Sequence, residues 1–207
     1  MKLFDFHHHK NHSSGIYNLG LFENIPQNKF SVGIHPKDVS EHFDERFLWL
    51  KRVSEDENCI AIGECGLDGL IEVDEELQEE CFEKQILWAN EIKKPVIIHC
   101  VRRFSQLLRF KKFAEVPMIV HGFNKKRNIA DDLQNAGFYL SFGKAVLQNV
   151  YLQQILADFP ISRMFLETDD ADFEIEELYQ KTSELKSISM ENLENQIQEN
   201  LRKITNL

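Results

Sequence analysis

The sequence predicts an α/β protein with the fold of a distorted, TIM-like (β/α) barrel, formed by residues 1–207 as a single domain. Short apolar runs alternate along the chain with longer segments of helical period, the pattern of βα units around a parallel sheet. Histidines and carboxylates follow several of these apolar runs, as polar side chains do at the mouth of a barrel. No linker, repeat or low-complexity tract divides the 207 residues, a length that buries a large core.

Each element follows from this alternation of short and long segments. The apolar runs predict strands near residues 3–6, 16–19, 30–34, 59–62, 96–98, 118–120, 138–140 and 164–166. The segments of helical period predict helices near residues 41–53, 75–92, 104–113, 128–136 and 151–158. The stretch from Phe173 to the end predicts two more helices, the last with Leu193, Ile197, Leu201 and Ile204 spaced by three and four residues.

Charge and composition limit the function classes. The formal net charge of -10 argues against a broad nucleic-acid-binding surface, because phosphate backbones are held chiefly by Lys and Arg. Any nucleic acid must therefore be bound locally. Cys59, Cys65, Cys81 and Cys100 form no C-x-x-C pair and are expected to be reduced thiols. No apolar run is long enough to cross a bilayer, so we expect a cytoplasmic protein without a membrane segment, and no obligate protein partner is evident.

Side chains that bind metals lie where the predicted strands end. In a β/α barrel the carboxyl ends of the strands converge on one mouth, so residues far apart in sequence meet there. Alternation along the first strand points His7 and His9 to the same side and His8 to the other. A lone histidine after a strand is usually structural, and we keep that interpretation for His8, His12 and His42. The candidate metal ligands are His7, His9, Glu64, His99, His121 and Asp169.

This donor set predicts two divalent cations. Four imidazoles and two carboxylates exceed what one catalytic zinc uses, about three protein ligands and an open position. Two cations, two carboxylates and a bridging hydroxide leave a net charge near +1, which attracts an anionic phosphodiester. Mixed imidazole and carboxylate donors favour Zn or Mn, with Mg as an ion that supports activity in assays.

Seven short motifs occur in a characteristic order between Leu3 and Asp169: FDFHHH, VGIHP, AIGECGLD, PVIIHC, VHGF, GFYLSFG and LETD. Together they resemble the TatD-type metal-dependent hydrolases, often described as deoxyribonucleases. A series of motifs in order is far more specific than any one of them. The resemblance implies a distorted TIM barrel, a two-metal centre and hydrolysis of phosphodiester bonds in DNA.

The resemblance also implies a role for each site residue. It places His7 and His9 on one metal, Glu64 between both metals, and His99 and His121 on the second. Asp169 would complete the site and accept a proton from the attacking water, so Glu64 and Asp169 are the candidate catalytic residues.

Substrate contacts form a second set of expectations. His35, in GIHP, matches a family histidine that contacts a phosphate or leaving group, and Arg102 would add positive charge at the barrel mouth. Asp68 is expected to order its loop or to support a ligating histidine, and Glu167 to make a supporting hydrogen bond.

The sequence departs from the family pattern at positions that bear on substrate. Lys37 stands where the family commonly has a histidine, Arg102 lies one residue further from its histidine, and Gly69 replaces an aromatic residue. The chain is short for a barrel, which typically has about 250 residues, and the family's terminal asparagine and arginine motif is not evident after Asp169.

Three functions remain open on the sequence. The leading one is a deoxyribonuclease, with exonucleolytic cleavage from the end of a strand as one form, that binds DNA or a small phosphodiester locally at the barrel mouth. The alternatives are a barrel amidohydrolase-like enzyme acting on a small ester, lactone or amide, and a metal-binding protein without catalysis. Because an activated water attacks carbonyl and phosphoryl groups alike, the ligands do not separate the first two. The lining of the pocket would separate these two functions. A basic groove with aromatic side chains favours a nucleic acid substrate, whereas a small closed pocket favours a small molecule.

Overall fold

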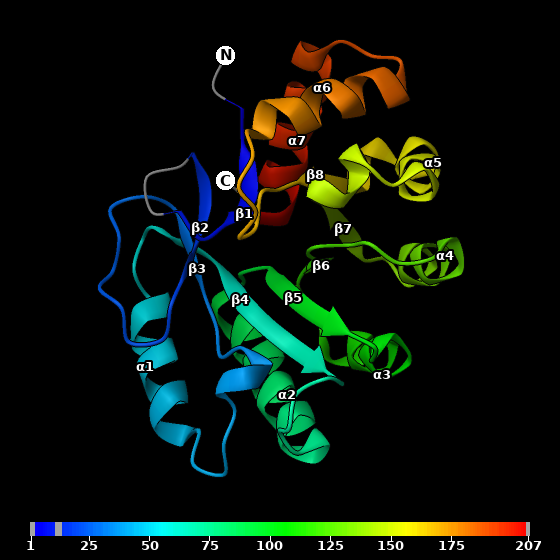
Figure 1. Cartoon of the computed structure of the whole chain (residues 1–207). Coiled ribbons are helices and arrows are strands. Elements are labelled where there is room, and N and C mark those ends of the chain that lie inside the picture. Colours follow the sequence, from blue (N-terminus) through cyan, green and yellow to red (C-terminus); the bar gives the residue numbers. More distant parts are fainter. Residues whose placement is uncertain (1–2, 11–13, 206–207) are drawn as a thin grey trace.

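Eight parallel strands form one sheet in the order β1 to β8, with the helices on its outside (Figure 1). The computed structural model describes residues 3–10 and 14–205, and His12 lies outside these described residues. The strands are β1 (Asp5–His8), β2 (Gly15–Leu19), β3 (Phe30–Val32), β4 (Cys59–Asp68), β5 (Val96–Val101), β6 (Met118–Val120), β7 (Tyr139–Phe142) and β8 (Met164–Leu166). The helices are α1 (Asp44–Ser54), α2 (Glu75–Ile92), α3 (Phe104–Phe110), α4 (Arg127–Asn135), α5 (Val150–Asp158), α6 (Ile175–Lys186) and α7 (Met190–Thr205).

The first and last strands meet and close the sheet into a barrel. Just beyond β8, the Asp169 backbone N–H donates to the carbonyl of His7 at 2.9 Å, and the His9 N–H donates to the carbonyl of Asp169 at 3.3 Å. A parallel bridge pairs His8 with Asp169. The predicted (β/α) barrel is therefore confirmed, and its seam lies at residues that the sequence assigns to the site.

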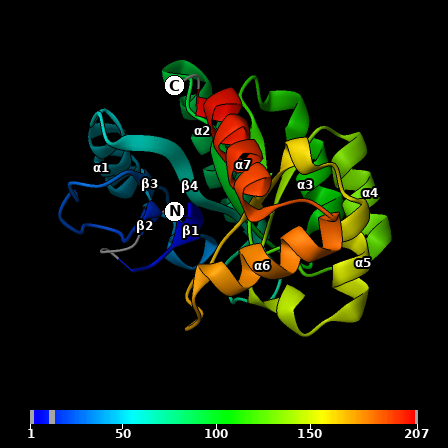
Figure 2. The same cartoon turned by 90° about the horizontal axis from the view of Figure 1, so that it is seen from above.

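The barrel is distorted because its first part lacks helices. In the described residues, β1, β2 and β3 follow one another through loops, whereas every later strand leads into at least one α-helix. Seen from above, α2 to α5 follow one another around the outside, and α6 and α7 lie near β1 (Figure 2). Two helices fewer in this part explain how a 207-residue chain completes eight strands.

Apolar side chains fill the barrel and the layer between the sheet and its helices. Phe6 of β1 stacks on Phe165 of β8, with ring centroids 4.1 Å apart, so the seam is also packed. All four cysteines are free and buried, as expected from their spacing. In the described part of the chain, no helix combines the length and the apolar character needed to span a bilayer.

Strands β4 and β5 run further than the sequence predicts. The expected ends at residues 62 and 98 became Asp68 and Val101, because Gly66, Leu67 and Asp68 pair with His99, Cys100 and Val101. The polar, glycine-containing sequence GECGLD is typical of a turn, so the prediction ended too early. Gly66 has a φ of +143°, and a Cβ there would overlap the His99 carbonyl, so only glycine allows this close pairing. The extension carries Glu64 and His99 into the barrel mouth.

Asp5 joins β1 to the segment after β8 inside the protein. It is 3% exposed, and its carboxylate accepts hydrogen bonds from the Thr168 N–H at 2.9 Å and the Thr168 hydroxyl at 2.6 Å. Replacing Asp5 by Ala leaves both buried donors unpaired, and we expect the free energy of unfolding to fall by about 3 kcal/mol. Urea denaturation measures this loss. Asp5→Asn keeps an acceptor for Thr168 and should lose about 1 kcal/mol; equal losses for Ala and Asn would contradict this account.

Candidate metal centre

Glu64 lies at the centre of the predicted site residues. It sits within β4 at 7% exposure. Its Oε1 lies 2.8 Å from His121 Nε2 and 2.9 Å from His99 Nδ1. Its Oε2 lies 3.7 Å from His7 Nε2. One carboxylate thus faces imidazoles from three other strand ends.

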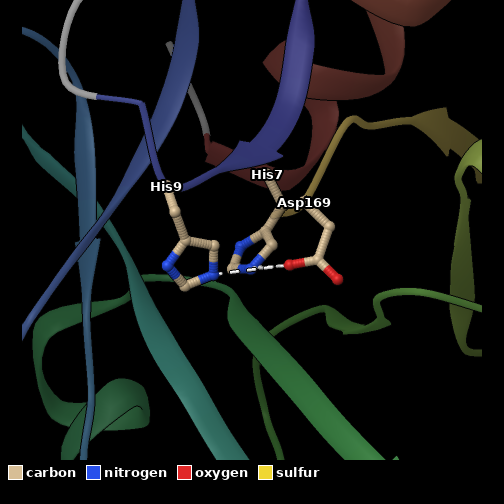
Figure 3. A group of neighbouring side chains, drawn as sticks. All are labelled: His7, His9 and Asp169. Atoms are coloured by element: carbon tan, nitrogen blue, oxygen red, sulfur yellow. Dashed lines mark ion pairs between the residues drawn. The ribbon is translucent and has the colours of Figure 1, made fainter. Parts of the chain in front are cut away.

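The β1 histidines approach Asp169 on the other side of this carboxylate. His7, within β1, and His9, just after it, both extend toward the Asp169 side chain (Figure 3). Asp169 Oδ1 lies 3.7 Å from His7 Nε2 and 3.4 Å from His9 Nε2. His8 lies on the other side of the strand, buried with its ring 6.2 Å from that of Tyr17. Alternate residues along a strand point to the same side, so His7 and His9 both face Asp169, as the sequence predicts.

Two further carboxylates orient the remaining imidazoles. Asp68 Oδ2 lies 2.9 Å from His99 Nε2, and its Oδ1 also accepts the Leu70 N–H at 2.8 Å. Glu167 is fully buried; its Oε1 accepts the Gly122 N–H at 2.6 Å and lies 3.4 Å from His121 Nδ1. Each imidazole thus has one nitrogen held by a carboxylate and the other turned toward Glu64. Supporting contacts of this kind fix the tautomer and ring orientation of metal-ligating histidines.

Charges in the cluster are strongly coupled. Burial by itself raises the pKa of Glu64, but the charge and hydrogen bonds of His121 and His99 outweigh it and hold that pKa well below its usual range. Burial lowers the pKa of His7 to about 3, so its ring is neutral. Burial also opposes protonation of His121, yet Glu64 and Glu167 raise its pKa well above the ordinary value. The site thus attracts positive charge between its carboxylates.

His35 faces the cluster from the loop after β3. Its Nδ1 accepts the Lys37 N–H at 3.0 Å, and burial lowers its pKa to about 4. A neutral ring that accepts at Nδ1 carries its proton on Nε2. That Nε2 lies 3.6 Å from Glu64 Oε1, and the ring centroid lies 4.4 Å from that of His99. His35 therefore presents an N–H donor to the mouth of the barrel.

A cavity of about 510 Å³ opens over these residues. Its lining includes His35, Glu64, His99, His121 and Asp169, together with the cation Lys125.

The arginine that the sequence predicts at the mouth follows β5 directly but does not line this cavity. Arg102 is exposed and is not among the residues that line the cavity. Its neighbour Arg103 is 9% exposed and pairs with Glu75, with 2.6 Å between Nη2 and Oε2. Lys125, one of several cations that follow strand ends, lines the cavity instead.

Asn18 is a site residue that sequence reasoning missed. From β2, its side-chain Oδ1 accepts the Glu64 N–H at 3.1 Å, and its Nδ2 donates to Glu64 Oε2 at 3.3 Å. It therefore holds both the backbone and the carboxylate of the central residue. A polar residue within the apolar run IYNL was the available signal.

The donor atoms fit a metal ion. Both ring nitrogens of His7 are buried and have no hydrogen-bond partner among residues 3–10 and 14–205, and Nε2 is turned between Glu64 and Asp169. Among the described residues, four groups have ligand atoms within 4.8 Å of one another: His7, His9 and Asp169; His7, Glu64 and His121; His35, Glu64 and His99; and His121, Glu167 and Asp169. Neutral imidazoles and ionised carboxylates are the forms that ligate divalent metals. These groups could hold a cation where the imidazole lone pairs face carboxylate oxygens.

Comparisons with known proteins identify a family that this chain resembles in sequence and in fold. A family model described as TatD related DNase matches residues 10–206. The uncharacterized metal-dependent hydrolase YabD of Bacillus subtilis is 32% identical over 145 residues, 67% of this chain and 57% of that protein. A 3'-5' ssDNA/RNA exonuclease TatD of Erwinia billingiae is 32% identical over 146 residues, 67% of this chain and 56% of that protein.

Two solved structures share the fold. YJJV, a TatD homolog from Escherichia coli K12, superposes with a TM-score of 0.83 at 20% sequence identity, covering 100% of this chain and 98% of that one. A hydrolase TatD family protein from Entamoeba histolytica gives 0.80 at 15% identity, covering 99% and 98%.

The curated relatives are longer than the matched part of this chain. The chain spans little more than half of YabD and of the Erwinia exonuclease, 57% and 56% of their lengths. The family model nevertheless runs from residue 10 to residue 206, across the strands that carry Glu64, His99 and Asp169. The matched range therefore includes seven of the eight strands, β2 to β8, and this chain belongs to the family of TatD-related DNases.

Proposed function

We propose that this protein is a metal-dependent hydrolase of phosphodiester bonds, a deoxyribonuclease that acts through two divalent cations. The observation that carries the proposal is Glu64, a buried carboxylate within hydrogen-bond distance of His99 and His121 and facing His7. Relatives of similar sequence include one named as a single-stranded DNA and RNA exonuclease, which supports a nucleic acid substrate cleaved from an end.

The contacts suggest how the ligands divide between the two ions. His7, His9 and Asp169 would hold the first, since their ligand atoms form one group. His99 and His121 would hold the second, since both rings approach Glu64 Oε1. Glu64 contributes an oxygen to each side and would bridge the pair. When bound, the two cations supply a positive centre that polarises the phosphoryl group and lowers the pKa of water.

Asp169 is the proposed proton acceptor. Burial tends to raise its pKa, but the contact with His9 and the charges of His121 and His7 bring that pKa below the ordinary value. Asp169 is therefore ionised, and it lines the cavity where an attacking water would lie. Its carboxylate would take the proton of the water as the water oxygen bonds to phosphorus and the bond from phosphorus to the leaving oxygen breaks.

His35 is the proposed substrate contact. Its Nε2–H donates into the cavity, where it would bind a non-bridging phosphate oxygen or the leaving oxygen. Lys125 adds a positive charge to the cavity lining. Arg102 is exposed, so its proposed contact with substrate would lie outside the cavity.

Metal identity and location complete the proposal. Four imidazoles favour zinc or manganese over magnesium, which prefers oxygen ligands. Four free, buried cysteines suit a reducing compartment, and we assign the protein to the cytoplasm. The whole chain, residues 1–207, would act as a single hydrolase domain.

The test combines elemental analysis with a panel of substrates. Purified protein should hold about two equivalents of transition metal. It should cleave bis(p-nitrophenyl) phosphate and end-labelled single-stranded DNA. Chelation should abolish both activities, and reloading with Zn²⁺ or Mn²⁺ should restore them.

The same panel separates the alternatives. Turnover of p-nitrophenyl acetate or a lactone without any diester cleavage would favour the amidohydrolase-like function. Bound metal without turnover of any diester or ester would contradict catalysis altogether.

A further inference from the structure

A second groove lies beside the metal-site cavity, on the outside of the barrel. It runs between α4 and α5, which lie side by side in both views (Figures 1 and 2). Its volume of about 810 Å³ is in the range of ligand sites, roughly 300–1,000 Å³. Asn124 and Lys125 line both the groove and the cavity, so the two are continuous. We call it the α4–α5 groove; its other lining residues are Lys126, Arg127, Ile129, Asn149, Tyr151, Leu152, Gln154 and Ile155.

The α4–α5 groove is basic in an acidic protein. Lys125, Lys126 and Arg127 are consecutive, and none of the residues that line the groove is acidic, whereas the chain carries a net charge of -10. Arg127 Nη2 is held by Asp158 Oδ2 at 2.6 Å and by the Gln154 carbonyl at 3.1 Å. Within the described residues, no carboxylate pairs with the ammonium groups of Lys125 and Lys126. The groove thus offers local positive charge that is still available to an anionic ligand.

The α4–α5 groove also displays an aromatic ring. Tyr151, in the first turn of α5, is 80% exposed. The Asn149 side chain caps this helix by accepting the N–H groups of Tyr151 and Leu152 at 3.0 and 3.2 Å, so the backbone that carries the ring is fixed. An exposed aromatic ring beside a charged groove is the combination that binds single-stranded nucleic acid, by base stacking and backbone contacts.

We propose that the α4–α5 groove holds the single strand that leads away from the scissile phosphodiester. Lys125 and Lys126 contact backbone phosphates next to the metal-site cavity, and Tyr151 stacks on a base further along. This inference rests on the proposed function, because it names the substrate class, single-stranded nucleic acid, and its path to the same site. It also explains how an acidic protein retains a polyanion: the attraction is confined to one groove.

The stacking contact is tested with Tyr151→Ala and Tyr151→Phe. The probe is a fluorescent, phosphorothioate-linked oligothymidylate, which resists cleavage, and binding to the metal-loaded protein is followed by anisotropy. Tyr151→Ala should weaken binding about 10-fold, because one base loses its stacking partner. Tyr151→Phe keeps the ring and should bind within about twofold of wild type. Neither variant should change the cleavage of bis(p-nitrophenyl) phosphate, which is too small to reach the groove.

The charge contact is tested with Lys126→Ala and the salt dependence of the same binding. Loss of one phosphate contact should reduce the slope of log K against log salt by about 0.7. Tyr151→Ala should leave the slope unchanged. The matched control is Lys29→Ala, the same change at an exposed lysine between β2 and β3, which should alter neither the affinity nor the slope.

The outcomes separate this inference from the proposed function. If the protein cleaves small diesters but Tyr151→Ala binds the strand as wild type does, the proposal that the α4–α5 groove holds the strand is wrong. The hydrolase proposal would be unaffected. Strand binding that depends on Tyr151 and Lys126, without any diester cleavage, would support the groove and contradict the hydrolase. Displacement of the strand by a polyglutamate peptide of equal charge at equal concentration would show a general polyanion site and overturn the nucleic acid assignment.

Discussion

Glu64→Gln is expected to lower the kcat of phosphodiester cleavage by about 10³-fold. The substitution keeps the shape of the side chain but removes the negative charge that His99, His121 and His7 surround. The amide of Gln also places an NH₂ group at one of the two positions where Glu64 has an oxygen, and a cation there would need an oxygen. Steady-state kinetics on bis(p-nitrophenyl) phosphate, together with metal analysis, measures the effect. Metal content should fall below two equivalents, because an amide nitrogen replaces the oxygen that one of the two ions needs.

The control for this prediction is Glu57→Gln, the same change at an exposed position. It should retain wild-type kinetics and metal content. If Glu64→Gln kept both its metal and its kcat, Glu64 would have no part in the centre, and the proposed bridge would be wrong.

Asp169→Asn is expected to lower kcat by about 10²- to 10³-fold while retaining most of the bound metal. Its amide oxygen still faces His7 and His9, so the first ion keeps a ligand atom at this position. The amide does not accept a proton at neutral pH, so the attacking water loses its base. Comparing kcat with metal content separates proton transfer from metal binding, and the KM should change much less than kcat.

Asp131→Asn is the matched control for Asp169, because it removes the same charge from an exposed residue of α4 that does not line the cavity. It should cleave the small diester at close to the wild-type rate. Equal losses in the two variants would mean that general negative charge, and not a positioned base, is responsible.

Much of the fold could be predicted from the sequence, because the spacing of apolar residues along the chain directly indicates local helix or strand structure. Each of the eight apolar runs is a strand, and the one that carries His7 and His9 turns them to the same side. The convergence of Glu64, His99, His121 and Asp169 followed from a single rule, that the carboxyl ends of parallel strands share one mouth. That rule holds whatever the sequence separation.

The remainder depends on contacts that no local pattern encodes. The extension of β4 to Asp68 requires pairing with β5, which overrides a sequence typical of a turn. The support of Glu64 by Asn18 depends on which strands are neighbours in the sheet. Two adjacent arginines, Arg102 and Arg103, look alike in the sequence, and only the turn after β5 decides that one is exposed and the other buried.

The seam of the barrel coincides with the proposed first metal site. His7 and His9 come from one edge of the sheet and Asp169 from the other, and few backbone hydrogen bonds join these edges. A cation shared by these side chains would act as a cross-link between His7 and Asp169, which lie 162 positions apart in the sequence, a separation that closes a very long loop. Metal supply would then govern the integrity of the barrel as well as its chemistry, since the ligand that completes the site also fastens the chain's beginning to its later part.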